Sequence, residues 1–532
     1  MLVSDIPAYA AHNAAHGAAP DAAIHFEGSA TSYALFNADC QRLARALVGE
    51  AAPGARVAVM SSNRPEFLAA YFAIPAAGLV MVPINTRLGP REIAHILDDA
   101  EPVLILVEPA WLGLVEQLQA SRPQALKLVV LGEAPAGALA YRDWLAAAPA
   151  HAALPSAADD DPAWLLYTSG TTGRAKGALL SHRSLMAGAI NTMCAFDLGR
   201  QEVALFLFPM FHIAGYSLLA YLLNSYPIVL MRGFETEAYL SAVQRYRITH
   251  HSIAPTMLAM VLEHPRVDDF DTSSLRFIAY GASAMPAEVI RAAMARWPGV
   301  GFGTGFGMTE LAGNVLYLSR DEHLRALQHQ PGVLAACGTP MPLAQVRLVD
   351  DEGLDVADGQ AGELAIKGDQ VFSAYWRNDA ANLASFRDGW FLSGDVGQRD
   401  AQGRMYIVDR KKDMIISGGE NVYSREVENL LYEHPSVAEV AVVGAADPIW
   451  GEQVVALLRL RDAADAADAA DAADAADASM LDAFCKPRIA GYKRPRRYIF
   501  VDELPKSAAG KILKAQLRQQ LADGIFDPRS PA

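Results

Sequence analysis

Residues Tyr167 to Gly177 read YTSGTTGRAKG, a stretch that combines three glycines with four serine or threonine residues and two cations. The stretch follows an apolar run, Trp164 to Leu166, and precedes a helix-like run from Ser181 to Ala195. Glycines let backbone N–H groups approach phosphate oxygens closely, and the hydroxyl groups add donors. A loop of this kind between a strand and a helix predicts a phosphate-binding loop. It does not match the P-loop pattern, because no Ser or Thr follows Lys176 to hold magnesium.

Strand-like apolar runs alternate with helix-like segments on both sides of this loop, from about Arg56 to Gly305. Such an alternation is typical of an α/β fold, in which helices cover both faces of parallel or mixed sheets. Ligands of these sheets bind in the loops beyond the carboxyl ends of the strands. Polar or glycine-rich segments follow four of the expected strands. The sequence therefore predicts one large site built from the loops TSGTTG, PMFHIAG, YGASA and GFGMTE.

The pattern of expected strands, helices and turns changes twice toward the C-terminus. After about Cys337, short strands alternate with Asp-Gly and Gln-Gly turns, which predicts a small β-barrel or sandwich at about 336–409. Beyond this region, amphipathic helices and apolar strands indicate a small α+β domain. We therefore expect an N-terminal domain at 1–409, a connection at 410–412 and a C-terminal domain at 413–532.

The segment from Asp462 to Ala478 is a D-A-A repeat with six aspartates. A helix advances about 100° per residue, so a period of three winds the aspartates around the helix and leaves no apolar face. We therefore expect a solvated, partly helical insertion in the C-terminal domain rather than a docking element.

Composition narrows the class of protein further. The chain has 532 residues, which is too long for one hydrophobic core, and its formal net charge is −15. That charge argues against a nucleic-acid-binding protein, which needs a basic face. Four widely spaced cysteines without a C-x-x-C pair indicate neither zinc nor disulfides and favour a reducing, cytoplasmic environment. The N-terminus shows no signal-peptide pattern, and the uncharged run Phe67 to Ile84 is interpreted as a buried helix and strand, because Pro75 and Gly78 interrupt it.

The loop YTSGTTGRAKG resembles the signature loop of the AMP-forming acyl-CoA synthetases, members of the adenylate-forming superfamily. Four further motifs resemble that family in the same order: GFGMTE (305–310), GWFLSGD (389–395), DRKKDMIISGGENV (409–422) and LPKSAAGKILK (504–514). The resemblance covers nearly the whole chain. It implies a large N-terminal domain of two helix-covered mixed sheets plus a small β-barrel, followed by a small, moving C-terminal α+β domain.

The resemblance also implies a two-step reaction. A carboxylic acid attacks the α-phosphorus of ATP to give acyl-AMP and pyrophosphate, and a thiol then attacks the acyl carbon. Mg²⁺ is the implied cofactor, ATP and CoA are the implied co-substrates, and a homodimer is left open. The implied catalytic residues are Lys511, Thr309, Glu310 and His212, with Glu310 as the metal ligand.

The other site residues implied by the resemblance fall into three groups. Residues around the nucleotide are Thr168, Ser169, Gly170, Thr171, Thr172, Gly173, Lys176, Gly281, Ala282, Ser283, Phe306, Gly307, Asp395 and Arg410. Lys412 matches the residue about which the C-terminal domain turns between the two steps. Residues expected at CoA are Gly418, Gly419, Trp450, Tyr492, Arg494 and Arg496, the last two within a cluster of cations at 493–497.

The sequence indicates less about the identity of the acid. Residues expected to line its pocket are small or apolar, with no Asp or Lys to pair an amino group or a second carboxyl group: Ser252–Pro255, Ala282–Met285, Gly303–Gly305 and Leu311–Asn314. Burial then favours a hydrophobic monocarboxylic acid. We expect a medium- or long-chain fatty acid, with an aryl or hydroxycinnamoyl acid, or an acyl-AMP ligase that loads a carrier protein, as the alternatives.

Three positions depart from the family pattern. Ala175 stands where proline is common, Phe306 replaces a common tyrosine, and Ser424 replaces a frequent proline. None of the three removes a catalytic group, so we expect an active enzyme.

Overall fold

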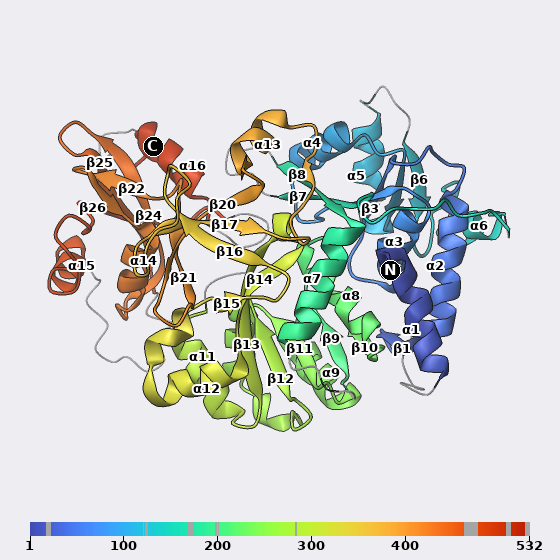
Figure 1. The fold of residues 1–532 in the computed structure, drawn as a ribbon, viewed down its shortest axis with the longest axis horizontal. Coiled ribbons are helices and arrows are strands. Elements are labelled where there is room, and N and C mark those ends of the chain that lie inside the picture. The colour runs from blue at the N-terminus through green and yellow to red at the C-terminus, as the bar shows by residue number, and fades with distance from the viewer. Residues whose placement is uncertain are drawn as a thin grey trace.

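The computed structural model describes residues 1–16, 23–120, 122, 126–149, 151–168, 175–196, 199, 202–281, 285–461, 477–506 and 512–526. Its N-terminal part is built on two large mixed sheets and its C-terminal part on a separate small sheet (Figure 1). The expected fold class is therefore confirmed. Most of the D-A-A repeat lies outside the described residues; its last aspartate, Asp477, caps the following helix by accepting from the Met480 N–H.

The first large sheet has nine strands. Its central strands are parallel, as apolar strands joined through helices require, and antiparallel strands close both edges. In spatial order the strands are β15 (Thr339–Pro340), β14 (Gly313–Leu318), β13 (Gly301–Met308), β12 (Phe277–Tyr280), β11 (His250–Ile253), β9 (Ala204–Phe206), β10 (Ile228–Leu230), β1 (Ala23–Phe26) and β2 (Ser29–Ser32).

The second large sheet has seven strands, and here too an antiparallel pair follows a parallel core. In spatial order they are β18 (Ala374–Tyr375), β8 (Lys176–Ser181), β7 (Pro162–Thr168), β4 (Val80–Pro83), β3 (Arg56–Met60), β5 (Leu104–Val107) and β6 (Lys127–Val130).

Helices fill the space between these two sheets and cover their outer faces. The main hydrophobic core lies between the sheets and takes residues from α2 (Tyr33–Leu47), α3 (Pro65–Ala76), α7 (His182–Ala195) and α8 (Tyr216–Leu223). Helix α3 is buried over most of its length and leads into β4, so the uncharged run Phe67 to Ile84 is a core helix and strand, as expected. Among the described helices, none is both long and apolar enough to cross a lipid bilayer.

The remaining N-terminal helices are α1 (Ile6–Ala15), α4 (Pro90–Ala100), α5 (Pro109–Gln119), α6 (Tyr141–Ala146), α9 (Thr236–Tyr246), α10 (Pro255–Leu262), α11 (Ala287–Arg296), α12 (Arg320–His329) and α13 (Asp379–Ser385). Helix α7 begins where the sequence predicted, because the Ser181 hydroxyl accepts the Ser184 N–H as an N-cap.

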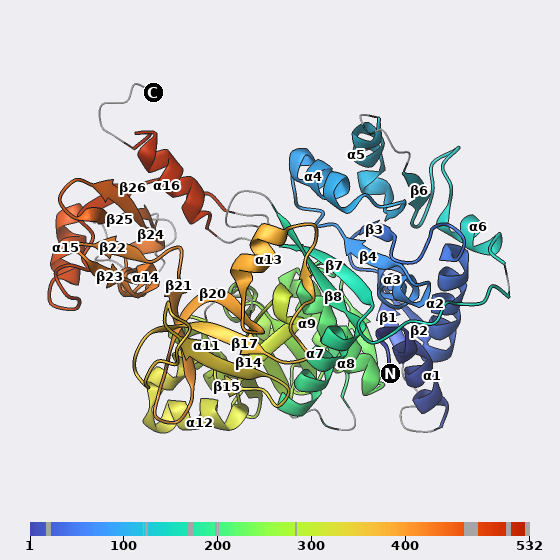
Figure 2. The ribbon, with the colours of Figure 1, turned by 45° about the horizontal axis from the view of Figure 1, so that its top comes forward.

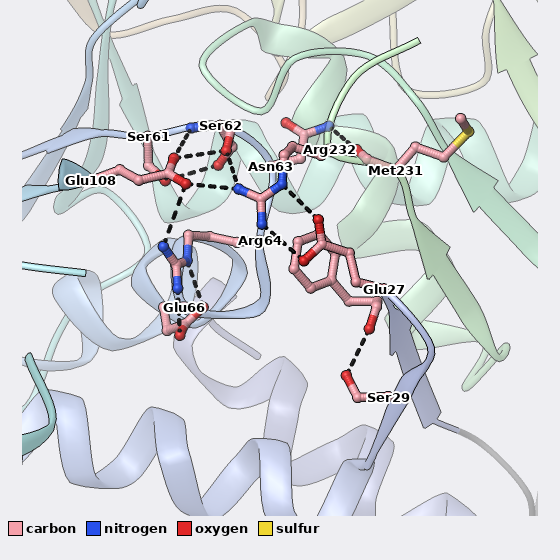
Figure 3. A network of polar contacts seen from close by, with 11 residues as sticks. Glu27, Ser29, Ser61, Ser62, Asn63, Arg64, Glu66, Glu108, Met231 and Arg232 are labelled. Carbon is pink, nitrogen blue, oxygen red and sulfur yellow. Dashed lines mark hydrogen bonds and ion pairs between the residues drawn. The ribbon is translucent and has the colours of Figure 1, made fainter. Parts of the chain in front are cut away.

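The two large sheets are tied together at the carboxyl ends of β3, β5 and β10 (Figure 3). Arg232, just beyond β10, pairs with Glu27 at 2.7 Å and with Glu108, just beyond β5, at 2.7 Å. Glu108 also accepts from the backbone and hydroxyl of Ser62 at 2.9 and 2.7 Å. Asn63 donates its amide across the gap to the Met231 carbonyl at 2.9 Å. This polar network sets the register of one sheet on the other.

The region expected as a β-barrel or sandwich is a five-stranded antiparallel half-barrel. In spatial order β16 (Gln345–Val349), β17 (Gly362–Lys367), β20 (Trp390–Arg399) and β19 (Phe386–Arg387) follow one another, and β21 (Met405–Arg410) pairs with the other half of the long strand β20. The motif GWFLSGD therefore lies mostly within a strand rather than in a loop.

The C-terminal part lies at the end of the molecule opposite the N-terminus in both views (Figure 2). Its sheet contains β23 (Glu420–Val422), β22 (Ile415–Ser417), β25 (Gly451–Leu460), β24 (Val437–Asp447) and β26 (Arg497–Phe500). Alternate residues of β24 face opposite cores. Helices α14 (Ser424–Tyr432) and α15 (Ala478–Cys485) cover one face, and α16 (Lys514–Ala522) covers the other.

Three buried histidines make the stability of this fold depend on pH. Burial lowers the pKa of His250 to about 3 and the pKa values of His251 and His323 to about 4. The unfolded chain therefore binds more protons below the ordinary histidine pKa of about 6.5, and stability is lost as the pH falls below that value. At pH 5.5 the three together should cost about 4 kcal/mol relative to pH 7.5.

Thermal melting at pH 7.5 and 5.5 checks this expectation. His323 accepts from the Tyr280 hydroxyl at 2.7 Å, and its other ring nitrogen donates to the Ser319 carbonyl at 2.8 Å. His323→Gln should melt with a smaller difference between the two pH values than the wild type, whereas a substitution at the exposed His329 should keep the full difference. Equal pH sensitivity in wild type and His323→Gln would contradict the assignment.

Candidate active site

The phosphate loop connects two antiparallel strands. Strands β7 and β8 form a hairpin in which Thr168 lies opposite Lys176, and the loop joins their ends. The prediction that the loop joins a strand directly to a helix was wrong, because β8 intervenes before α7. The error arose because Lys176 to Ser181 is too short a run to separate a strand from the start of a helix by periodicity.

Part of the predicted site lies outside the described residues. This applies to Ser169, Gly170, Thr171, Thr172, Gly173, Ala282, Ser283 and Lys511. Their expected roles stay predictions.

Glu310 and Lys176 meet at one tyrosine that the sequence analysis did not single out. The Tyr375 hydroxyl donates to Glu310 Oε1 at 2.8 Å, and the Lys176 ammonium lies 4.8 Å from the centre of the Tyr375 ring. Glu310 is only 8% exposed. Burial and the Glu310 charge raise the pKa of Tyr375, so its hydroxyl remains a proton donor. A single side chain thus links the expected metal ligand to the strands β7 and β8 that carry the phosphate loop, which we call its stem.

Residues expected around the adenine and the α-phosphate lie at adjacent strand ends. Strand β12 ends at Tyr280, which is paired with Thr304 of the parallel strand β13, so Gly281 and Gly305 are neighbours. Strand β13 continues through Phe306 and Gly307 to Met308, with a bulge between Phe306 and Gly307. The GFGM part of GFGMTE is therefore strand rather than loop. Bulges of this kind commonly re-aim side chains next to active sites.

The turn after β13 contains Thr309 and Glu310 in a short 3₁₀ helix, Thr309–Leu311. The Glu310 carbonyl accepts the Phe372 N–H at 2.8 Å, which ties this turn to the segment that carries Tyr375. Among the described residues there is no group of three or more His, Cys, Asp or Glu side chains that could hold a metal ion by itself.

Asp395 and Arg410 face each other across strands β20 and β21. The Asp395 carboxylate is 3% exposed and pairs with the Arg410 guanidinium at 3.0 Å. Arg410 lies close enough for its charge to act on Tyr375 as well. These two motif residues are therefore brought toward the Glu310 side of the site.

The residues on either side of Lys412 are bound to different parts of the molecule. Lys411 pairs with Glu363 of β17 in the half-barrel at 3.1 Å. Asp413 pairs with Arg518 of α16 in the C-terminal part at 3.0 Å. Lys412, which lies between them, is exposed. The chain therefore passes from one anchored body to another at this residue.

The residues expected at CoA are only partly assembled. Gly418 and Gly419 both have positive φ and form the two-residue turn between β22 and β23. The Gly418 N–H donates to the Trp450 carbonyl at 2.8 Å, and a β-carbon on Gly418 would lie 2.8 Å from the Trp450 ring. The Arg496 guanidinium lies 4.0 Å from the centre of the same ring. Gly418, Trp450 and Arg496 thus form one contact cluster.

The expected cluster of cations at 493–497 is partly neutralised. Lys493 pairs with Glu426 at 2.8 Å and Arg494 pairs with Asp482 at 2.7 Å. Tyr492 is 36% exposed beside Lys493. The sequence could not show these pairs, because both carboxylates lie on other elements, the helices α14 and α15, and meet the cations only in the folded chain.

Near the expected acid pocket, aromatic rings lie across the glycine-rich face of β13. A β-carbon on Gly303 would lie 2.7 Å from both the Phe277 ring and the Tyr317 hydroxyl. Phe196 packs edge-on against Phe277 and Tyr317, with ring centres 5.6 and 5.0 Å apart, and His250 stacks on Phe277 at 5.4 Å. We call Phe196, His250, Phe277 and Tyr317 the aromatic cluster.

His212 and Gly281 follow two strands of the same nine-stranded sheet, β9 and β12. His212 precedes a short 3₁₀ helix, Ile213–Gly215, and its ring packs against Phe211 with centres 4.7 Å apart. A β-carbon on Gly281 would lie in ordinary van der Waals contact with the Gly305 carbonyl oxygen, at 3.8 Å.

Comparison with known proteins decides the family. The AMP-binding enzyme family matches residues 11–376, and the AMP-binding enzyme C-terminal domain matches residues 426–511. The chain belongs to the AMP-binding enzyme family. The resemblance drawn from the five motifs is therefore confirmed, and so is the expected enzyme class, an AMP-forming acid–CoA ligase.

Relatives of this AMP-binding enzyme match it over nearly its full length. A protein named feruloyl-CoA synthase from an Amycolatopsis species is 38% identical over 511 residues, covering 94% of this chain and 95% of the relative. An indoleacetate–CoA ligase from Aromatoleum aromaticum is 35% identical over 513 residues, covering 95% and 96%. The structure of o-succinylbenzoate coenzyme A synthetase from Bacillus subtilis, solved with ATP and magnesium, is 28% identical with a TM-score of 0.81, covering 96% and 98%.

Sequence reasoning missed Tyr375, although it bridges two predicted site residues of this AMP-binding enzyme. Strand β18 is only two residues long and pairs with β8, almost two hundred positions earlier in the chain. So short a strand has no readable period, and the pairing is visible only in the folded chain.

Proposed function

We propose that this AMP-binding enzyme is an ATP-dependent ligase that joins a hydrophobic aromatic monocarboxylic acid to CoA through an acyl-AMP intermediate. The observation that carries the proposal is the meeting of Lys176 and Glu310 on Tyr375, which brings a phosphate-loop cation and a buried carboxylate to one place. A site that binds a nucleoside triphosphate and its metal needs both a cation and a carboxylate.

Glu310 fits Mg²⁺ in this role. Mg²⁺ keeps several waters and is usually bound through one or two carboxylates together with substrate phosphates, so a single buried carboxylate suffices. Tyr375 occupies one Glu310 oxygen and so orients the carboxylate. When bound, the ion would screen the charge of the triphosphate.

The protein's work in the first step is positioning and charge neutralisation. The acid carboxylate attacks the α-phosphorus, the bond to pyrophosphate breaks, and the loop from Thr168 to Lys176 holds the departing pyrophosphate. Thr309 contacts the α-phosphate, His212 lies beside the acid carboxylate, and Lys511 bridges the carboxylate and the α-phosphate. Gly281 and Phe306 flank the adenine.

Asp395 accepts from the ribose hydroxyls, and Arg410 contacts the ribose or a phosphate. Lys412 acts as the pivot between the two steps, a role that the separately anchored neighbours Lys411 and Asp413 support. In the second step the CoA thiol attacks the acyl carbon and AMP leaves. Gly418, Gly419, Trp450, Tyr492, Arg494 and Arg496 are the residues proposed to meet CoA.

The choice of an aromatic acid departs from our expectation of a fatty acid, which is not confirmed. Two observations support the change. The two relatives described above are named for a hydroxycinnamic and an arylacetic acid. The aromatic cluster lies across the strand expected to line the pocket, and flat rings pack favourably against a flat aromatic substrate.

A panel of acids tests this proposal. Ferulic, coumaric, indoleacetic, benzoic, octanoic and palmitic acids should be assayed for AMP release and thioester formation with free CoA. We expect the arylpropenoic or arylacetic acids to exceed palmitic acid in kcat/KM by about a hundredfold, the range that a few misfitted methylene groups cause in a closed pocket. Palmitic acid as the best substrate would overturn the aromatic assignment. Acyl-AMP formation without consumption of free CoA would favour a carrier-protein ligase.

A further inference from the structure

We propose that His95 is a positioning residue for ATP: together with Asp99, it clamps the two strands that carry the phosphate loop. The proposal rests on the proposed function, since it concerns how that ATP site is held. His95 touches no predicted substrate atom and belongs to none of the motifs.

The first half of the clamp is a contact between helix α4 and the exit of the phosphate loop. His95 Nε2 lies 3.1 Å from the Ala175 carbonyl oxygen. A carbonyl can only accept, so Nε2 carries the proton and donates. Ala175 is the last residue before strand β8, directly before Lys176. The helix therefore holds the backbone of the loop at the point where it re-enters the sheet.

The second half is a contact between the same helix and the entry of the loop. Asp99 Oδ2 accepts from the Tyr167 hydroxyl at 2.5 Å, and Tyr167 lies on β7 directly before Thr168. Asp99 follows His95 by four residues, so both lie on one face of α4 about one turn, 5.4 Å, apart. Neighbouring strands are about 4.8 Å apart, so one helix face can hold both strands at once.

Trp376 joins the same helix to the exit strand of the loop. Its indole N–H donates to the Asp99 carbonyl at 3.1 Å, and its backbone N–H donates to the Gly177 carbonyl at 2.7 Å. The guanidinium groups of Arg56 and Arg377 each lie 5.2 Å from the centre of its ring. The two strands are thus bound to the helix both directly and through this tryptophan.

Between these elements lies a polar cavity of about 160 Å³. It is lined by His95, Asp99, Ala175, Lys176, Gly177, Trp376, Arg377 and Asn378. Leu165, Tyr167 and Trp376 pack around Gly177, whereas the bond from His95 to Ala175 borders this polar cavity. Loss of that bond leaves the Ala175 carbonyl without this donor.

The clamp should affect ATP affinity rather than the chemical step. The loop residues lie between the two anchored ends, and freeing one end restores backbone freedom that ATP binding must then remove again. Glu310, a reacting group proposed above, is held by Tyr375 and not by His95. The expected signature is therefore a change in KM for ATP with little change in kcat.

The test compares His95→Phe with His95→Gln. Phenylalanine keeps a flat ring but removes the donor, and glutamine keeps an N–H that can reach the Ala175 carbonyl. We expect His95→Phe to raise both the KM for ATP and the equilibrium Kd of MgATP about three- to tenfold, the effect of one lost hydrogen bond, with kcat within about twofold. His95→Gln should recover most of the loss. Titration calorimetry with MgATP and no acid measures the Kd without turnover.

A second variant tests whether His95→Phe weakens ATP binding because the backbone at Ala175 is no longer restrained. Proline at position 175 fixes φ and reduces backbone freedom at the point where His95 acts. Ala175→Pro combined with His95→Phe should therefore bind MgATP within about twofold of the wild type. A double variant as weak as His95→Phe would overturn the clamp.

The matched control is His16→Phe. His16 makes the same kind of bond, from a ring nitrogen to the His12 carbonyl at 2.8 Å, on a surface helix away from the loop. It should leave the KM and Kd for ATP unchanged. Unchanged MgATP binding in His95→Phe, or equal losses in His95→Phe and His16→Phe, would contradict the proposal.

Failure of the clamp and failure of the proposed function give different results. If the wild type binds MgATP but activates none of the acids tested, the choice of acid fails, while the Kd comparison still decides the clamp. If the wild type is active and His95→Phe has a normal Kd, only the clamp fails.

Discussion

Replacing Lys511 by alanine should abolish formation of acyl-AMP, with a loss of about a hundredfold or more, the usual cost of removing one charge that stabilises the transition state. The reason is electrostatic. The attacking carboxylate and the α-phosphate are both anionic, and a lysine between them neutralises charge that would otherwise repel. Formation of acyl-CoA from supplied acyl-AMP should stay within a few-fold of the wild type, because the lysine is not needed there.

The structure explains why this substitution should remove a charge without unfolding the C-terminal domain. Leu504 is buried in the core beneath α16, and Ile512 packs against the same core. Lys506 and Ile512 are joined by a backbone bridge, and Lys514 pairs with Glu428 at 2.7 Å. The residues that flank Lys511 in the chain are therefore anchored in the domain on both sides.

Lys506→Ala is the matched control. Lys506 lies at the other end of the same segment and pairs with Glu439 at the surface. It should lose the same charge without affecting adenylation by more than about twofold, because surface ion pairs contribute little. ATP–pyrophosphate exchange measures the first step, and thioester formation from synthetic acyl-AMP measures the second. Survival of both steps in Lys511→Ala would show that another residue carries the charge.

The second large effect is expected at Glu310. Glu310→Gln keeps an oxygen that can accept from Tyr375 and keeps the volume of the side chain, but it removes the negative charge. ATP–pyrophosphate exchange should fall about a hundredfold or more, because the substitution removes the proposed protein ligand of the metal that screens the triphosphate.

Electron paramagnetic resonance of Mn²⁺·ATP measures binding independently of turnover, and we expect Glu310→Gln to bind this complex at least tenfold more weakly. Glu202→Gln is the control, since Glu202 is also a buried carboxylate, 7% exposed, but lies by the start of β9 next to Arg276. Normal Mn²⁺·ATP binding by Glu310→Gln would show that the carboxylate is not the metal ligand.

The candidate site residues came from the motifs. Each motif is a short, continuous run that resembles one of the family, and this resemblance implied Glu310, Asp395, Arg410 and the phosphate loop, whose roles stay predictions. Strands such as β3, β5 and β12 were equally readable, because a continuous apolar run bounded by turn residues has few alternatives.

Predictions that depended on pairing partners were less successful. The loop before Lys176 was placed between a strand and a helix, although β8 folds back on β7 to form a hairpin. The cations at 493–497 were treated as a cluster, although Glu426 and Asp482 neutralise two of them. In both cases the deciding partner is set by tertiary packing and leaves no local signal.

The sequence by itself determined the fold class of this protein, which follows from hydrophobic periodicity, and its reaction class, which follows from the resemblance of five contiguous motifs to one enzyme family. Only the tertiary structure decided what supports those motifs. Tyr375 joins Glu310 to Lys176, and His95 holds Ala175, through residues that are far apart along the chain. The physical reason is that hydrogen bonds and packing act over a few ångströms in space, whatever the distance in sequence.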